Sequence, residues 1–137
     1  MIRAVLDTNV VISIAIEGGR LQSLAAAWRE ARFRWLISQE IFDEYLRVLT
    51  YPRFELSSED IQRIVELEIR PYAELIHVTT HVRAIPEDPS DDKFLDCAVD
   101  GRADWIVSGD QHLLRLKTFR GIRIGSPREF LHLIRKP

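Results

Sequence analysis

In the stretch Ile2-Arg3-Ala4-Val5-Leu6-Asp7-Thr8-Asn9, a short apolar run ends at an acid. The apolar residues 2–6 predict a buried strand. The next apolar segment, residues 9–17, is closed by two glycines at a helical length, so we expect a helix that packs against the sheet. The stretch therefore begins the alternation of strand and helix that decides the fold.

The alternation continues along the chain. Further strands are expected at residues 33–37, 75–78, 105–107 and 122–124. Helices are expected at residues 21–31, 39–50, 57–70, 91–101, 112–116 and 127–134, and a polar loop at 80–90. This order predicts an α/β fold, a three-layer α/β/α sandwich around a central, mostly parallel sheet of about five strands. Because no linker or repeat interrupts it, we expect a single domain over residues 1–137.

Composition narrows the class of protein. Hydrophobic residues make up 46% of the chain, which is enough for a packed core. No apolar run reaches the ~20 residues that a membrane helix needs, and no signal peptide is expected. The one cysteine, Cys97, cannot form an internal disulfide and lies in an apolar helical pattern, which indicates a core residue. The expected location is the cytoplasm.

Charge is unevenly distributed along the chain. Residues 1–110 hold 20 acids against 12 Lys and Arg, whereas residues 111–137 hold one acid, Glu129, against seven. The basic segment is either a solvated surface or an edge that faces phosphates. Its candidate contacts are Arg115, Lys117, Arg120 and Arg123.

Four acids occupy positions from which they can converge. Asp7 and Asp110 each follow an expected strand, and ligands of parallel sheets bind at the carboxyl ends of strands. Glu44 and Asp92 lie on helices between them, and Asp96 is on the same helical face as Asp92.

Some of these positions also have a simpler explanation. Acids in the first turn of a helix, here Asp91 and Asp92, favour the helix dipole. Asp110 suits the N-cap of the next helix, and Glu44 suits a surface.

If these carboxylates meet, they need a cation. Two charges about 4 Å apart repel by about 4 kcal/mol at an effective dielectric constant of about 20. Ligands that are all oxygen favour a hard ion, Mg²⁺ or Mn²⁺. Zinc is not indicated, because there is no cysteine pair and the four histidines show no ligand spacing. Such an ion commonly acts on phosphates, so phosphodiester hydrolysis is the expected reaction.

At four places the sequence resembles PIN-domain ribonucleases, in particular the toxin components of toxin–antitoxin pairs. The matching stretches are Val5-Leu6-Asp7-Thr8-Asn9, Ser38-Gln39-Glu40-Ile41-Phe42-Asp43-Glu44-Tyr45-Leu46-Arg47-Val48-Leu49, Asp91-Asp92-Lys93-Phe94-Leu95-Asp96-Cys97-Ala98 and Ala103-Asp104-Trp105-Ile106-Val107-Ser108-Gly109-Asp110. Together they span most of the chain.

The resemblance implies roles for individual residues. The catalytic acids that hold the metal would be Asp7, Glu44, Asp92 and Asp110, with Asp96 as an additional ligand or as the third acid itself. Ser108, which stands where the family usually has threonine, and Asn9 would orient ligands or water.

The resemblance also implies an activity and partners. A divalent ion would activate water to hydrolyse RNA, and Lys93, Arg115, Lys117 and Arg120 would contact the RNA backbone. Relatives of the toxin type are homodimers that a cognate antitoxin neutralises.

Two other functions stay open. A phosphatase of the haloacid dehalogenase type also places an Asp after its first strand, but it needs a second Asp where this chain has Asn9. A PIN-like scaffold that binds RNA or protein without catalysis is the other alternative. Metal-dependent cleavage of single-stranded RNA separates the nuclease from both.

Overall fold

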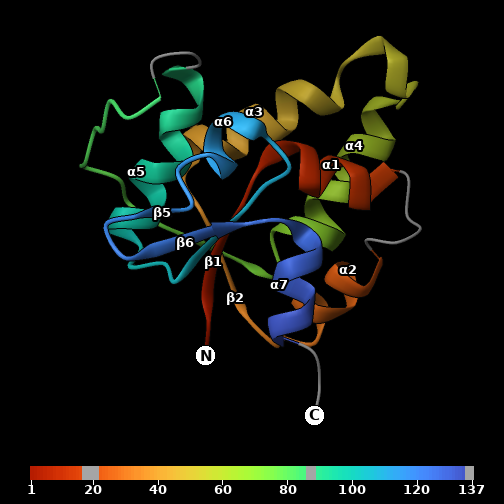
Figure 1. Ribbon diagram of the computed structural model, residues 1–137. Coiled ribbons are helices and arrows are strands. Elements are labelled where there is room, and N and C mark those ends of the chain that lie inside the picture. Colours follow the sequence, from red (N-terminus) through yellow and green to blue (C-terminus); the bar gives the residue numbers. More distant parts are fainter. Residues whose placement is uncertain (17–21, 86–88, 135–137) are drawn as a thin grey trace.

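The computed structural model describes residues 1–16, 22–85 and 89–134. Their strands form one six-stranded sheet in the order β3-β2-β1-β4-β6-β5 (Figure 1). The strands are β1 Arg3–Leu6, β2 Arg34–Ile37, β3 Ala73–Leu75, β4 Trp105–Val107, β5 Thr118–Phe119 and β6 Ile122–Gly125. All neighbours are parallel except β5 and β6. The predicted α/β class with a mostly parallel sheet is confirmed, with one strand more than expected.

Helices connect the strands. The α-helices are α1 Thr8–Ile16, α2 Gln22–Arg29, α3 Gln39–Leu49, α4 Ser58–Ile64, α5 Asp92–Asp100, α6 Gln111–Leu114 and α7 Pro127–Ile134. Short 3₁₀ turns lie at Pro52–Phe54 and Pro89–Asp91, and Val65–Ile69 forms a π-helical segment after α4. The expected end of the first helix near residue 17, the expected start of the second at residue 21 and residues 86–88 of the polar loop lie outside the described residues.

The two faces of the sheet carry different helices. Trp35 of β2 stacks on Trp28 of α2 with ring centroids 4.6 Å apart, and Trp105 of β4 contacts Phe130 of α7. Successive strand residues point to opposite faces, so Leu36 lies on the other face, where it contacts Gly101 at the end of α5. Helices therefore cover both faces, as Figure 1 shows.

Three elements differ from their predicted form. The third strand lies at residues 73–75 instead of 75–78, because its pairing with β2 sets its position. The helix expected at 57–70 begins as predicted, with a capping box between Ser57 and Asp60, but widens into the π-helical segment. The strand β5 was not predicted; Arg120 and Gly121 both have positive φ, the conformation that a two-residue hairpin turn requires.

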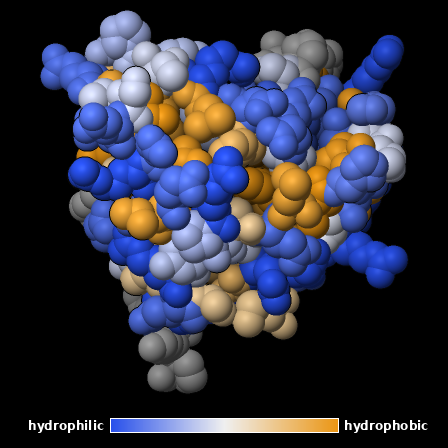
Figure 2. All heavy atoms as spheres, turned by 180° about the vertical axis from the view of Figure 1, so that it is seen from behind, coloured by the Kyte–Doolittle hydropathy of each residue, from blue (hydrophilic) through white to orange (hydrophobic). Residues whose placement is uncertain are grey.

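Within the described residues, no helix combines the length and apolar character that crossing a membrane requires. On the reverse face, hydrophobic residues gather in patches between hydrophilic ones (Figure 2). Cys97 is fully buried, and burial raises the pKa of its thiol to about 12, which agrees with a role in the core.

Candidate metal centre at the carboxyl end of the sheet

Asp7 and Ser108 follow the neighbouring strands β1 and β4, so the topology brings them together. Register pairs Leu6 with Val107, and the amide of Asp7 donates to the carbonyl of Val107 at 2.9 Å. The hydroxyl of Ser108 donates to Oδ2 of Asp7 at 2.6 Å and accepts the amide of Asp110 at 2.9 Å. Asp7 is only 5% exposed and Ser108 is fully buried. Ser108 therefore fixes one oxygen of Asp7 and the start of the Asp110 turn.

The environment of Asp7 opposes its charge. Burial raises the pKa of the Asp7 carboxyl from its ordinary value of 3.8 to about 6. The hydrogen bond from Ser108 lowers this pKa, whereas the nearby charges of Asp110 and Glu44 raise it. Three acids from three parts of the chain therefore influence one another at this end of the sheet.

Glu44 is held toward this group by α3. The next residue, Tyr45, is fully buried and donates its hydroxyl to the carbonyl of Leu6 at 2.6 Å, which joins α3 to the end of β1. The hydroxyl of Thr8 donates to Oε2 of Glu44, and Nζ of Lys93 lies 2.7 Å from Oε1. Both Glu44 oxygens therefore have partners inside the protein, unlike those of a surface glutamate.

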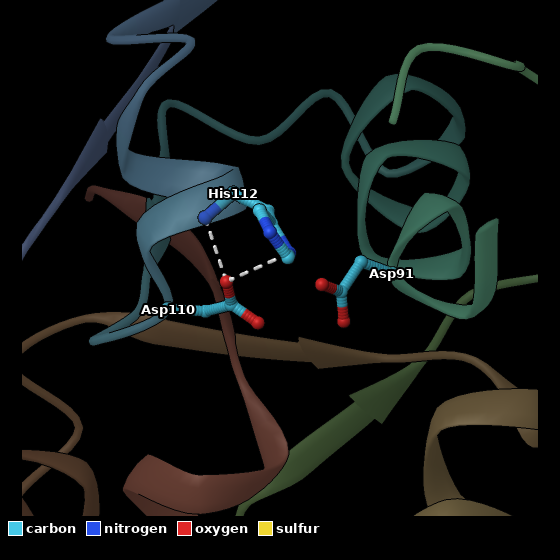
Figure 3. Close-up of side chains that lie close together, drawn as sticks. All are labelled: Asp91, Asp110 and His112. Atoms are coloured by element: carbon cyan, nitrogen blue, oxygen red, sulfur yellow. Dashed lines mark hydrogen bonds and ion pairs between the residues drawn. The ribbon is translucent and has the colours of Figure 1, made fainter. Parts of the chain in front are cut away.

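Asp91, at the start of α5, lies close to Asp110 and His112. One ligand atom each of Asp91, Asp110 and His112 lies within 4.8 Å of the other two, and Figure 3 shows Asp91 pointing from the start of α5 toward the other two. Asp110 is also the N-cap of α6, since its Oδ1 accepts the amide of His112 at 2.7 Å. Asp110 can therefore cap α6 and also belong to the site. We call Asp7, Glu44, Asp91 and Asp110 the acidic cluster.

Asp92 and Asp96 have other partners. Oδ1 of Asp92 accepts the amides of Ala84 and Ile85 at 3.2 and 3.1 Å, and Oδ1 of Asp96 accepts the amide of Val82 at 2.7 Å. Burial raises the pKa of Asp96.

Asp100, one helical turn further on, accepts the amides of Thr79 and Thr80. This stripe of acids on α5 therefore ties down the segment 79–85. The geometry favours Asp91 over Asp92 as the third acid, and it gives Asp96 a structural contact.

The remaining candidate residues lie in different surroundings. Lys93 is buried, where it contacts Glu44 and the carbonyl of Ser90, so it is not on an outer surface. Asn9 is exposed and lines a cavity beside α1. The four candidate basic residues of the C-terminal part, Arg115, Lys117, Arg120 and Arg123, are exposed, as is Arg128. Of these, Arg123 pairs with Glu129 at 3.0 Å.

Sequence reasoning did not include Thr8, Asp91 or His112 in the site. For Asp91, the sequence feature that could have indicated its position is Pro89. Pro89 begins a 3₁₀ turn that ends at Asp91, so Asp91 precedes the helix and its side chain points away from that of Asp92. His112 follows a helix cap by two residues, a position that carries no ligand pattern in sequence.

The donor set fits a hard divalent cation. It consists of carboxylate oxygens with one imidazole nitrogen at its edge, a combination suited to Mg²⁺ or, with the nitrogen, to Mn²⁺. The pKa of Asp7, which burial and then the charges of Asp110 and Glu44 raise, points the same way, because a nearby cation would stabilise the charged carboxylate.

Comparison with models of known protein families identifies a match. A family model described as PIN domain matches residues 3–112, a span that contains all four acids of the cluster and His112. No curated protein matches the chain.

Proposed function

Because this chain belongs to the PIN domain family, whose members are generally nucleases, we propose that it is a Mg²⁺- or Mn²⁺-dependent endoribonuclease that hydrolyses RNA phosphodiester bonds. The observation that carries the proposal is the acidic cluster itself. Its members follow β1 and β4 or lie on α3 and at the start of α5. Asp110 and Glu44 act on Asp7, whose pKa is raised to about 6, and Asp91 lies near Asp110.

Asp7, Asp91 and Asp110 would hold the ion, with Glu44 beside them. When bound, such an ion stabilises negative charge on a phosphate and makes water a better nucleophile. The chain's own residues set the geometry. Ser108 orients Asp7, and Thr8 orients Glu44.

Two further contacts complete this arrangement. Lys93 balances the charge of Glu44, and the amide of His112 fixes Asp110. Buried supports of this kind keep ligands in place without movement during the reaction.

The proposal extends to the biological role. Four motif stretches similar to those of PIN-domain toxins support a single-domain toxin over residues 1–137 that acts in the cytoplasm as a homodimer and is neutralised by a cognate antitoxin. Induced expression would then arrest growth, the Asp7→Asn variant would not, and co-expression of a neighbouring small gene would restore growth. Equal growth arrest by the variant would contradict the toxin role.

The test of the enzymatic proposal is cleavage of single-stranded RNA with Mg²⁺ or Mn²⁺ present. We expect EDTA to abolish it, and Asp7→Asn or Asp91→Asn to lower kcat/KM by about 100-fold or more, the scale of losing a group that stabilises the transition state. Asp92→Asn is the matched control and should stay within about threefold of wild type, because its carboxylate bonds the 84–85 amides.

Three outcomes would contradict parts of this scheme. Cleavage that survives EDTA would rule out the metal-dependent reaction. A larger loss in Asp92→Asn than in Asp91→Asn would return the third-acid role to Asp92. RNA binding without any cleavage would favour the non-catalytic scaffold.

A further inference from the structure

A cavity of about 540 Å³ lies against α1. Its lining residues are Asn9, Ile12, Ser13, Ile16, Arg53 and Phe54. Its apolar side belongs to a small hydrophobic cluster, separate from the main core, in which Ile12, Val48 and Leu49 are buried and Ile16 and Phe54 pack against them. The cavity therefore combines an apolar wall with an exposed amide and an exposed guanidinium.

Arg53 is held at the mouth of this cavity by aromatic rings. Its guanidinium carbon lies 4.8 Å from the ring centre of Phe54 and 5.9 Å from that of Tyr51, and Tyr51 is 40% exposed. Among the ion pairs of the described residues, none uses Arg53. The cation is therefore available to an anion from outside the chain.

The turn that carries Arg53 has a fixed shape. The amide of Tyr51 donates to Val48 at 3.0 Å, and the amide of Phe54 donates to Tyr51 at 3.0 Å. Glu55 ends the turn in the left-handed conformation, with φ of 51°. Binding an anion at Arg53 therefore requires little ordering of the backbone.

The cavity wall and the acidic cluster are linked along the sequence at the start of α1. Asn9, on the cavity wall, directly follows Thr8, whose hydroxyl contacts Glu44. A group bound at Asn9 is therefore within one helical turn of Thr8 and its contact with Glu44.

We propose that this cavity binds one nucleotide of single-stranded RNA next to the phosphate that is cleaved, an inference that rests on the proposed function. Ile12, Ile16 and Phe54 contact the face of the base, as apolar and aromatic groups do in other single-strand sites. The Asn9 amide bonds the edge of the base, and Arg53 bonds the adjacent phosphate. A nucleotide matches this cavity better than an apolar peptide does, because the cavity offers a cation stacked on rings beside an amide.

The test uses a short fluorescein-labelled single-stranded RNA and fluorescence anisotropy in EDTA, so that binding is measured without cleavage. We expect Arg53→Gln to raise Kd about tenfold, the loss that a charged hydrogen bond of typical strength predicts. Arg53→Lys should recover part of the affinity, and Asn9→Ala should change which bases are preferred at the cleavage site. Arg102→Gln, an exposed arginine beyond the far end of α5, is the matched control.

The outcomes separate this proposal from the nuclease assignment. If Arg53→Gln and Asn9→Ala bind and cleave RNA as Arg102→Gln does, while Asp7→Asn abolishes cleavage, the cavity proposal fails and the nuclease assignment stands. If wild type never cleaves RNA but Arg53→Gln still weakens binding, the cavity binds RNA but the nuclease assignment fails, and with it the position next to a cleaved phosphate. A cavity filled by a partner protein would leave the RNA affinity of Arg53→Gln unchanged, which overturns the proposal.

Discussion

The Asp7 carboxyl is easier to protonate in the folded chain than in the unfolded one, since its pKa rises from 3.8 to about 6. The protonated form therefore stabilises the metal-free fold. That stabilisation is fully present below the unfolded pKa of 3.8 and is lost as the pH rises through about 6. The shift corresponds to about 3 kcal/mol of folding free energy for this buried group.

The raised pKa of Asp7 predicts how the stability of the fold depends on pH. In EDTA, Asp7→Asn should raise the melting temperature relative to wild type at about pH 8 but not at about pH 4, because the amide carries no charge to bury. Addition of Mn²⁺ should raise the melting temperature of wild type and leave that of the variant nearly unchanged. Thermal denaturation at both pH values checks this, with Asp43→Asn, an exposed acid on α3, as the control. A difference between wild type and Asp7→Asn that does not depend on pH would refute the buried charge.

His112 adds the imidazole nitrogen to the site, with Nδ1 3.7 Å from Oδ1 of Asp110. Nitrogen ligands suit Mn²⁺ better than Mg²⁺. We expect His112→Ala to weaken Mn²⁺ binding about tenfold, while activity with Mg²⁺ changes much less. Metal titrations of activity with each ion measure the two effects, and equal losses with both would mean that His112 does not contact the ion.

At the residue scale, sequence placed an acid at the end of each central strand, and the structure brings Asp7 and Asp110 within mutual electrostatic reach. It placed Asp92 in the site and assigned Asp91 to the helix dipole. Neighbouring helical residues point about 100° apart, so Asp91 faces Asp110 whereas Asp92 faces the amides of Ala84 and Ile85. The 3₁₀ turn at Pro89–Asp91 sets that start, and its position depends on tertiary packing.

Among the elements, α5 does most to position the acidic cluster, since Asp91 stands at its start and Lys93 in its first turn. The helix packs closely against β1, β2 and β4. At its end, a Cβ added to Gly101 would lie 2.8 Å from the carbonyl oxygen of Cys97 and 2.9 Å from Cδ1 of Leu36. Glycine at this position therefore permits the close approach of α5 to the sheet.

Gly101→Ala should therefore destabilise the fold by about 1–3 kcal/mol, the usual cost of overpacking a tight contact. It should also weaken metal binding, because a displaced α5 moves Asp91. Urea denaturation and Mn²⁺ titration measure the two effects. Gly109→Ala is the control for stability, since a Cβ there would meet nothing within 4 Å. Equal stability of the two variants would contradict the packing argument.

An element could be predicted from the sequence when residues close to it in the chain determine where it starts and ends. The helices α3 and α4 begin at Ser38 and Ser57, whose side chains accept amides inside the helix, and this chemistry is visible in sequence. The position of strand β3 depends on residues that are distant in the sequence. Leu75 is 63% exposed, so no buried apolar run identifies the residues that pair with β2. The two-residue strand β5 exists through its pairing with β6.

At the scale of the whole molecule, the basic residues of the C-terminal part face solvent, whereas the acids converge at the carboxyl end of the sheet. Arg115, Lys117 and Arg120 are all exposed. If they contact RNA phosphates, replacing all three by Gln should weaken RNA binding and reduce the slope of log Kd against log salt by about 2 to 3, roughly one per phosphate contact. Anisotropy in EDTA at several salt concentrations measures this. An unchanged slope would assign these residues to a solvated surface.

The described sheet ends in two very short strands, β3 with three residues and β5 with two. Each rim therefore presents few backbone amides and carbonyls to which a foreign segment could hydrogen bond. We expect this to protect the folded chain from fibril growth at high concentration, and to direct any assembly toward helices and loops.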